Sequence, residues 1–204
     1  MREYATLSQA SYDHASDAPS RDYEEYGWQV VGGGDGVVTF QRAGDDGVPQ
    51  YAVAFKGTSL SGPTTASDLA NDALILAGGE TNPEGVGNFD ENTDFVKRFT
   101  NEVAGGNAGQ VTITGHSLGG TYAMQASKAT GSKAIVYNPG VSPLSVADYY
   151  SDPGLSDIQI YRVAGDPVST SAALLKPSGH IQSHTIHKWH PPTTSAHALS
   201  NFLD

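Results

Sequence analysis

The sequence predicts one α/β domain over residues 1–204, with a mixed, mostly parallel central sheet, flanking helices and antiparallel N-terminal strands. Two observations lead to this prediction. Short β-branched runs separated by Gly- and Asp-rich turns fill residues 28–56, which is typical of an antiparallel meander. After residue 109, strand-like and helix-like runs alternate, which is typical of parallel βαβ units.

The composition excludes several classes of function. The chain has 22 Asp and Glu against 11 Lys and Arg, so its net charge is -11. Such a surface repels phosphate, which argues against nucleic-acid binding and against stable binding to anionic membranes. The sequence has no cysteine, which excludes disulfides, thiolate metal sites and a cysteine nucleophile. The 38% of apolar residues suffices for a core, and a domain of this size buries about 70% of its unfolded surface.

The first half of the chain should form a helix and then the meander. Residues 3–11 carry apolar side chains near helical spacing. The Gly-rich turns could cradle a phosphate, but strands flank them and no Lys-Ser/Thr pair follows, so we interpret them as hairpin turns. The expected strands cover residues 28–31, 37–42 and 50–56, and the expected turns cover residues 32–36 and 43–47.

The second half should alternate between helices and strands, and chemistry is expected at the carboxyl ends of its parallel strands. Two of these strands, 134–137 and 158–164, are apolar enough to be buried on both faces. The expected helices are 68–76, 88–104, 118–129 and 198–202, and the expected strands are 110–114, 134–137, 158–164 and 184–189.

The strongest motif is G-x-S-x-G at residues 115–119, between a β-branched run and a helix-compatible run. A strand, a sharp turn and a helix would place the hydroxyl of Ser117 above the edge of the sheet. Gly115 and Gly119 lack the Cβ atoms that would clash where the strand and the helix come close. The motif therefore predicts Ser117 as a nucleophile.

A serine hydroxyl needs a base to take its proton, and in this arrangement an acid and then a histidine follow the serine in the chain. Asp166 lies directly after the predicted strand 158–164, at the carboxyl end where the acid is needed. Three other acids, Asp148, Asp152 and Asp157, precede that strand and should lie at the opposite edge. We therefore expect Asp166 to be the acid.

The base should be a histidine after Asp166. His197 lies in a loop beyond the last predicted strand and can reach over the nucleophile, so it is the first choice, with His180 as the alternative. His116 precedes the serine on its strand and is expected to pack beside it. A metal site is not expected, because strand geometry would place the three remaining candidates on alternating faces. These are His184, His187 and His190.

Two backbone donors should stabilise the negative charge that develops on the substrate oxygen. Leu118 would offer its N–H at the N-terminus of the predicted helix. The strand over residues 50–56 is followed by Gly-Thr, so Thr58 could offer a second N–H and its hydroxyl. A strand that ends in Gly-Thr is a weak signal by itself.

Taken together, these motifs resemble the fungal-type class 3 lipases and their bacterial and phage relatives, which have the α/β-hydrolase fold. The resemblance runs from about residue 50 to the end. It implies a triad of Ser117, Asp166 and His197, an oxyanion hole of Thr58 and Leu118, and hydrolysis of carboxylic esters of lipids without a cofactor or metal. It rests on Phe-Lys-Gly-Thr at 55–58, Asp68-x-x-x-Asp72, Gly-His-Ser-Leu-Gly-Gly at 115–120, Asn-Pro-Gly at 138–140, Gly-Asp-Pro-Val at 165–168 and a late histidine.

The chain departs from these lipases where a lid could lie. Residues 78–88 hold a single apolar side chain, Val86, whereas a lid that opens on lipid needs an apolar inner face. This favours an esterase or phospholipase with transient contact to lipid over a fat-digesting lipase. The apolar run 73–77 should be the core face of its helix or line the acyl pocket. The same triad would also serve thioesters, acylated polysaccharides or amides.

No signal peptide and no apolar stretch long enough for a membrane helix are expected, so the sequence leaves the compartment open. The alternative function, from a different class, is a non-catalytic binding or structural module, associated with a virion or a toxin, that retains the fold. Labelling by a covalent serine probe would separate the two.

Overall fold

The computed structural model describes residues 1–14, 19–34, 36–58, 89–141, 157–170, 172, 179–188 and 194–203. Three expectations fall outside this part of the chain: the helix over 68–76, the apolar run 73–77 and the candidate lid segment 78–88. No helix in the described ranges is long and apolar enough to cross a bilayer.

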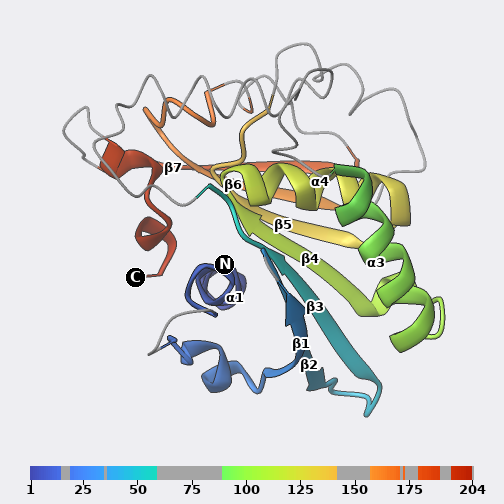
Figure 1. Cartoon of the computed structure of the whole chain (residues 1–204). Coiled ribbons are helices and arrows are strands. Elements are labelled where there is room, and N and C mark those ends of the chain that lie inside the picture. Colours follow the sequence, from blue (N-terminus) through green and yellow to red (C-terminus); the bar gives the residue numbers. More distant parts are fainter. Residues whose placement is uncertain are drawn as a thin grey trace.

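A sheet forms the centre of the molecule, and its described strands lie in the order β1 to β7 (Figure 1). The first three strands pair antiparallel, whereas β3 to β7 all pair parallel. This confirms the predicted mixed, mostly parallel sheet with antiparallel N-terminal strands. The strands are β1 (Gln29–Gly34), β2 (Val37–Ala43), β3 (Pro49–Phe55), β4 (Val111–His116), β5 (Lys133–Tyr137), β6 (Ile158–Val163) and β7 (Ile181–Ile186).

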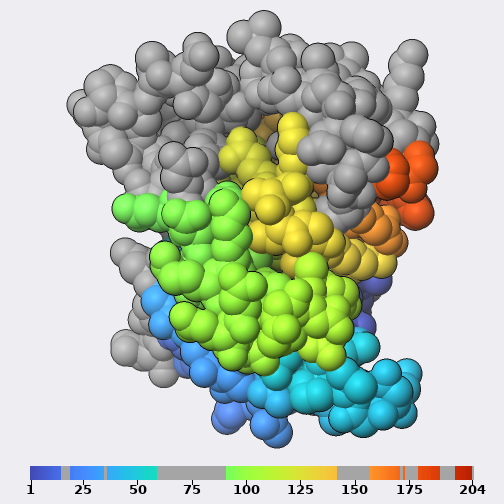
Figure 2. All heavy atoms as spheres, turned by 90° about the vertical axis from the view of Figure 1, so that its right-hand side faces the viewer, coloured from blue at the N-terminus to red at the C-terminus, as the bar shows by residue number. Residues whose placement is uncertain are grey.

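Helices cover both faces of this sheet (Figure 1). On one face, α3 (Phe89–Val103) and α4 (Leu118–Thr130) pack over the central strands, and Figure 2 views the molecule from this side, where their green atoms lie. On the other face lie α1 (Arg2–Asp13) and the C-terminal 3₁₀ turns η5 (Thr194–His197) and η6 (Leu199–Phe202). Two further 3₁₀ turns are η1 (Asp22–Tyr26) and η2 (Ala108–Gln110).

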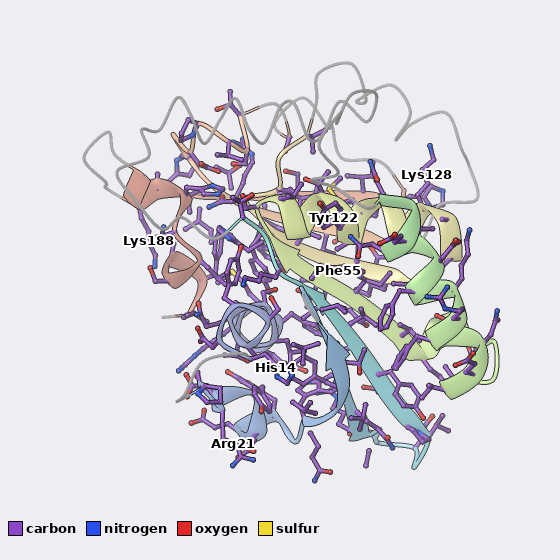
Figure 3. The ribbon with its side chains drawn as sticks, in the orientation of Figure 1. His14, Arg21, Phe55, Tyr122, Lys128 and Lys188 are labelled. Carbon is purple, nitrogen blue, oxygen red and sulfur yellow. The ribbon has the colours of Figure 1, made fainter. Side chains whose placement is uncertain are left out.

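Each face has its own buried apolar cluster. Under α3 and α4, strand residues such as Val53, Ile113 and Ile160 pack with Met124. Phe55 meets Tyr122 edge to face, with ring centroids 6.1 Å apart, and both are labelled in Figure 3. The opposite face packs against α1 and the C-terminal turns. Burial on both faces explains the continuous apolar runs 51–55 in β3 and 134–137 in β5.

The structure corrects several sequence-based boundaries. The glycines at 32–34 continue β1 after a register shift between Val30 and Gly32, so they are not part of the predicted turn. Strand β7 covers 181–186, three residues earlier than expected. The predicted C-terminal helix 198–202 is the short 3₁₀ turn η6, and His197 ends a separate 3₁₀ turn, η5, that precedes it.

Strand β6 also differs from the expectation of burial on both faces. Its residues Gln159, Tyr161 and Arg162 are only half-buried. Strand β6 lies next to β7, which is the last strand of the described sheet. Strand β5, the other strand expected to be buried, is buried from Ala134 to Tyr137.

Two glycines allow α4 to lie directly against the sheet. A Cβ atom on Gly119 would overlap the carbonyl oxygen of Phe55 at the end of β3. A Cβ atom on Gly115 would likewise overlap the carbonyl of Gly119 one turn further on. The strand, the turn at Ser117 and the helix therefore meet backbone to backbone, as the motif predicts.

This contact generates a stability prediction. Gly119→Ala should lower the free energy of unfolding by at least about 2 kcal/mol, because backbone atoms with no room to move must shift. The matched control is Gly34→Ala in β1, where a Cβ atom would meet nothing within 4 Å and the loss should stay below about 1 kcal/mol. Urea unfolding measures both, and equal losses would contradict the close-contact interpretation.

Candidate active site

Ser117 lies in the sharp turn between β4 and α4. Its backbone has φ 58° and ψ -127°, and among the described residues only Ser117 and Asn138 combine a side chain with a positive φ. The Ser117 N–H donates to the carbonyl of Tyr137 at 3.0 Å, and its own carbonyl accepts from Thr121 N–H at 3.2 Å. These two bonds hold a backbone conformation that costs about 1–3 kcal/mol, a kind of strain found often at functional sites.

Asp166 and His197 form a buried pair, although 31 residues separate them in the sequence. Oδ1 of Asp166 lies 3.0 Å from Nδ1 of His197, and the two residues are 2% and 3% exposed. Asp166 follows β6, as predicted, and its carboxylate also accepts the backbone N–H groups of Val168 at 3.1 Å and Ser169 at 3.0 Å. The carboxylate therefore has three donors around it.

These hydrogen-bond donors favour the ionised form of Asp166 and thereby determine which nitrogen of His197 carries a hydrogen. Burial would raise the pKa of Asp166, but the hydrogen bond and charge of His197, with the bonds from Ser169 and Val168, outweigh burial, and the pKa lies below its usual value. An ionised carboxylate only accepts hydrogen bonds, so Nδ1 of His197 carries the hydrogen. The other ring nitrogen, Nε2, then carries the lone pair in the neutral ring. This nitrogen is buried and has no hydrogen-bond partner among the described residues.

The main chain at His197 is held by two side chains from the sheet. Nε2 of His116 lies 2.6 Å from the His197 carbonyl oxygen, and Nδ2 of Asn138 donates to the same oxygen at 3.1 Å. Asn138 also donates to the carbonyl of Ala196 at 3.1 Å and accepts from Val163 N–H at 2.8 Å. Asn138 therefore ties η5 to the carboxyl end of β6, and His116 ties it to the end of β4.

The contacts of His116 define its tautomer. A carbonyl oxygen can only accept, so Nε2 of His116 carries the hydrogen that it shares with His197. Nδ1 is then an acceptor, and the hydroxyl of Tyr12 lies 3.1 Å from it. Burial, and then the nearby charge of His197, lower the pKa of His116 to about 3. The ring is therefore neutral in ordinary buffers.

The segments that carry the two expected oxyanion donors meet at the Ser117 turn. Leu118 is the first residue of α4, where helix N–H groups have no partner within the helix. Thr58 follows Gly57, and a Cβ atom on Gly57 would lie 3.3 Å from the Cβ of Ser117 and 2.5 Å from the carbonyl oxygen of His116. The chain after β3 therefore passes directly against the Ser117 turn.

The remaining candidates lie elsewhere. His180 is exposed, and its carbonyl accepts the N–H of Ile158 at the amino end of β6, the edge opposite Asp166. Asp157 lies at that amino edge too, as expected, where it pairs with Lys133 at 3.2 Å. His184 stacks on Tyr161 with ring centroids 4.7 Å apart. The other two acids weighed, Asp148 and Asp152, and His190 lie outside the described residues.

Sequence reasoning assigned no role to Tyr12 or Asn138. Tyr12 reaches the site from α1 across 104 residues of sequence, and no local pattern reports such a contact. Asn138 belongs to the Asn-Pro-Gly motif, but its positive φ of 41° and its side-chain bonds to η5 come from tertiary structure. For His116, a packing role was expected, and its hydrogen bond to His197 is additional.

The neutral His116 generates a pH prediction. Its pKa is about 3 in the folded chain and about 6.5 in the unfolded chain, so between these values the unfolded chain binds the extra proton. The free energy of unfolding should therefore fall as the pH falls from 6.5 toward 3. The variant His116→Gln keeps a hydrogen-bond donor but cannot titrate. Its free energy of unfolding should therefore decrease between pH 7 and 4.5 by up to about 2 kcal/mol less than that of the wild type.

Urea unfolding at several pH values measures this effect. The matched control is His14→Gln, which changes an exposed histidine and should keep the wild-type slope. Parallel curves for wild type and His116→Gln would mean that His116 is not the group that titrates.

Comparisons with known proteins give the following results. No curated protein matches the chain significantly. Among solved structures, the chain is similar to the extracellular lipase LipA of Serratia marcescens, with 18% identity and a TM-score of 0.39 over 78% of this chain and 30% of that one. The chain thus spans less than a third of that lipase. It is also similar to an esterase of Pyrobaculum calidifontis, with 14% identity and a TM-score of 0.39 over 92% of this chain and 82% of that one.

The family comparison covers most of the chain and agrees with the ester-hydrolase chemistry expected from the motifs. The matching family is of the lipase or esterase type, and the match does not single out the class 3 lipases. Residues 3–188 match the Tle-like phospholipase domain, so the chain belongs to this phospholipase-like family.

Proposed function

We propose that this chain hydrolyses carboxylic esters of phospholipids with Ser117 as nucleophile, His197 as base and Asp166 as the acid that orients the base. The observation that carries this proposal is the buried hydrogen bond between Asp166 and His197, 3.0 Å long, which leaves Nε2 of His197 with a lone pair. His197 also stays close to the Ser117 turn, because its ring centroid lies 4.7 Å from that of His116.

In the first step, Nε2 of His197 takes the proton of Ser117 while the serine oxygen attacks the ester carbonyl. The imidazolium that forms is stabilised by Asp166, which is already ionised and needs no rearrangement. The tetrahedral oxyanion accepts hydrogen bonds from the N–H groups of Thr58 and Leu118. Collapse of this intermediate releases the alcohol, which takes the proton from His197.

In the second step, a water molecule loses a proton to His197 and attacks the acyl-enzyme. The new carboxylic acid leaves, and the proton returns to Ser117. The strained turn at Ser117 and the backbone bonds that hold His197 keep both groups in place for the two half-reactions. Such positioning lowers the barrier because little reorganisation remains at the moment of reaction.

The family match supports a phospholipid as the substrate. The motifs shared with the class 3 lipases support the same triad on a glycerolipid ester. The net charge of -11 favours contact with zwitterionic lipid, because an anionic surface would repel the protein. We therefore expect phosphatidylethanolamine or phosphatidylcholine to be hydrolysed faster than phosphatidylglycerol.

A serine probe tests the nucleophile. A fluorophosphonate should add once to the wild type, as measured by intact mass, and not at all to Ser117→Ala. Ser117→Ala should lose at least about 10³-fold in phospholipid turnover while it keeps the wild-type unfolding curve. The exposed Ser200→Ala is the control and should label and turn over normally. A folded wild type that neither labels nor turns over would favour the non-catalytic module.

A substitution of Asp166 tests its proposed role as the acid of the triad. Asp166→Asn removes the ionised acceptor and allows the wrong tautomer of His197, so kcat should fall by about 10³- to 10⁴-fold. Asp157→Asn at the opposite edge of the sheet provides the matched control and should change kcat less than twofold. Similar kcat values for the two variants would remove Asp166 from the mechanism.

A further inference from the structure

Arg162 is a partly buried cation that has no side-chain partner in the part of the chain that the structure describes. Its Nε atom is shielded from solvent and makes no hydrogen bond to any described residue. No described acid forms a salt bridge with it, although the chain has 22 acidic residues. A shielded guanidinium N–H without an acceptor costs about 1–3 kcal/mol, so an acceptor group brought to Arg162 would stabilise it.

The sheet register places Arg162 on the same level as the nucleophile. His116, Tyr137 and Tyr161 form one row across β4, β5 and β6. The N–H groups of Ser117 and Asn138 donate to Tyr137 and Tyr161, which continues the pairing by one residue. Ser117 and Arg162 thus share the next row, two strands apart. Adjacent strands are about 4.8 Å apart, so the two Cα atoms are separated by about 10 Å.

Alternation along β6 shows on which face Arg162 lies. Ile158 and Ile160 belong to the core cluster under α3 and α4, whereas Tyr161 stacks on Tyr137 on the opposite face. Arg162 follows the period of Ile158 and Ile160, so it lies on the face of α4. Helix α4 begins at Leu118, directly after Ser117, on this same face.

Arg162 has the chemistry of a phosphate ligand. Its planar guanidinium presents several N–H donors in a fork that matches two oxygens of a phosphate group. Asp166, four residues later at the same edge, is already engaged by His197, Val168 and Ser169. An anion that reaches the Ser117 edge from outside therefore finds Arg162 as an available cation.

We propose that Arg162 binds the phosphodiester of the phospholipid whose acyl ester is attacked at Ser117. This inference rests on the proposed function and adds how the enzyme recognises a phospholipid. The glycerol backbone joins the ester to the phosphate, and it would span the distance of two strand spacings between Ser117 and Arg162. A neutral glyceride lacks the phosphate and gains nothing from Arg162.

The experiment compares two substrates that differ only in the head group. Dioleoyl phosphatidylethanolamine and dioleoylglycerol are presented in the same nonionic detergent micelles, and kcat/KM is measured for wild type, Arg162→Gln and Arg162→Lys. Arg162→Gln should lose about 10- to 100-fold on the phospholipid and less than threefold on the diacylglycerol. Arg162→Lys should lose less, because it keeps the charge but not the fork. Arg98→Gln, which removes an exposed cation on α3, should leave both values unchanged.

Equal losses on both lipids in Arg162→Gln would overturn the inference, and so would no loss on either. If Arg162→Gln does not fold, the selectivity of Arg162→Lys decides in the same way. If neither variant folds, an inhibition experiment on the wild type alone tests the proposal. Hydrolysis of p-nitrophenyl butyrate should be inhibited competitively by sn-glycerol 3-phosphate and not by glycerol, and absence of inhibition would overturn the inference.

Two further outcomes have a defined meaning. Inorganic phosphate that inhibits as strongly as sn-glycerol 3-phosphate would show a free-anion site and overturn recognition of the lipid head group. A wild type that hydrolyses neither lipid nor the p-nitrophenyl ester would contradict the proposed function itself. This result differs from a failure of the Arg162 proposal, in which the wild type is active but the Arg162 variants do not discriminate between the two lipids.

Discussion

The site depends on one steric constraint, the contact of α4 with the ends of β3 and β4 at backbone distance. Gly115 and Gly119 make this contact possible, since any side chain there would strike a carbonyl group. The contact forces the turn at Ser117 into its unusual backbone conformation and brings the chain after β3 against it. The serine, the start of the helix and the expected oxyanion donors are thus positioned by a single packing event, not by separate interactions.

The histidine is held differently, through its own main chain. His116 and Asn138 grip the carbonyl oxygen of His197 while Asp166 binds its ring. Tyr12 completes the arrangement by contacting His116 from α1. These groups come from α1, β4 and the chain after β5 and β6, and all of them except the half-buried Tyr12 are buried. In such surroundings hydrogen bonds are strong and an unpaired group is costly, so the arrangement tolerates few alternatives.

Much of this arrangement could be predicted from the sequence, because the informative signals are local. The strand, turn and helix around Ser117 follow from glycine spacing, and the place of Asp166 follows from its position after an apolar strand. The contacts of Tyr12 and Asn138 could not be predicted, since they join residues 104 and 59 positions apart. The end of the chain was harder for another reason. Short 3₁₀ turns such as η5 and η6 have little periodicity, so they resemble both loops and helices.

The wide separation of Ser117 and His197 along the chain has a consequence for biosynthesis. A ribosome that has released the serine turn must still add 80 residues before the histidine appears, and η5 can dock on β4 only after that. Every shorter nascent chain therefore lacks His197 and the main-chain bonds that hold it. The pairing of Asp166 with His197 is therefore a late event in the synthesis of this fold, and it follows the appearance of the serine turn.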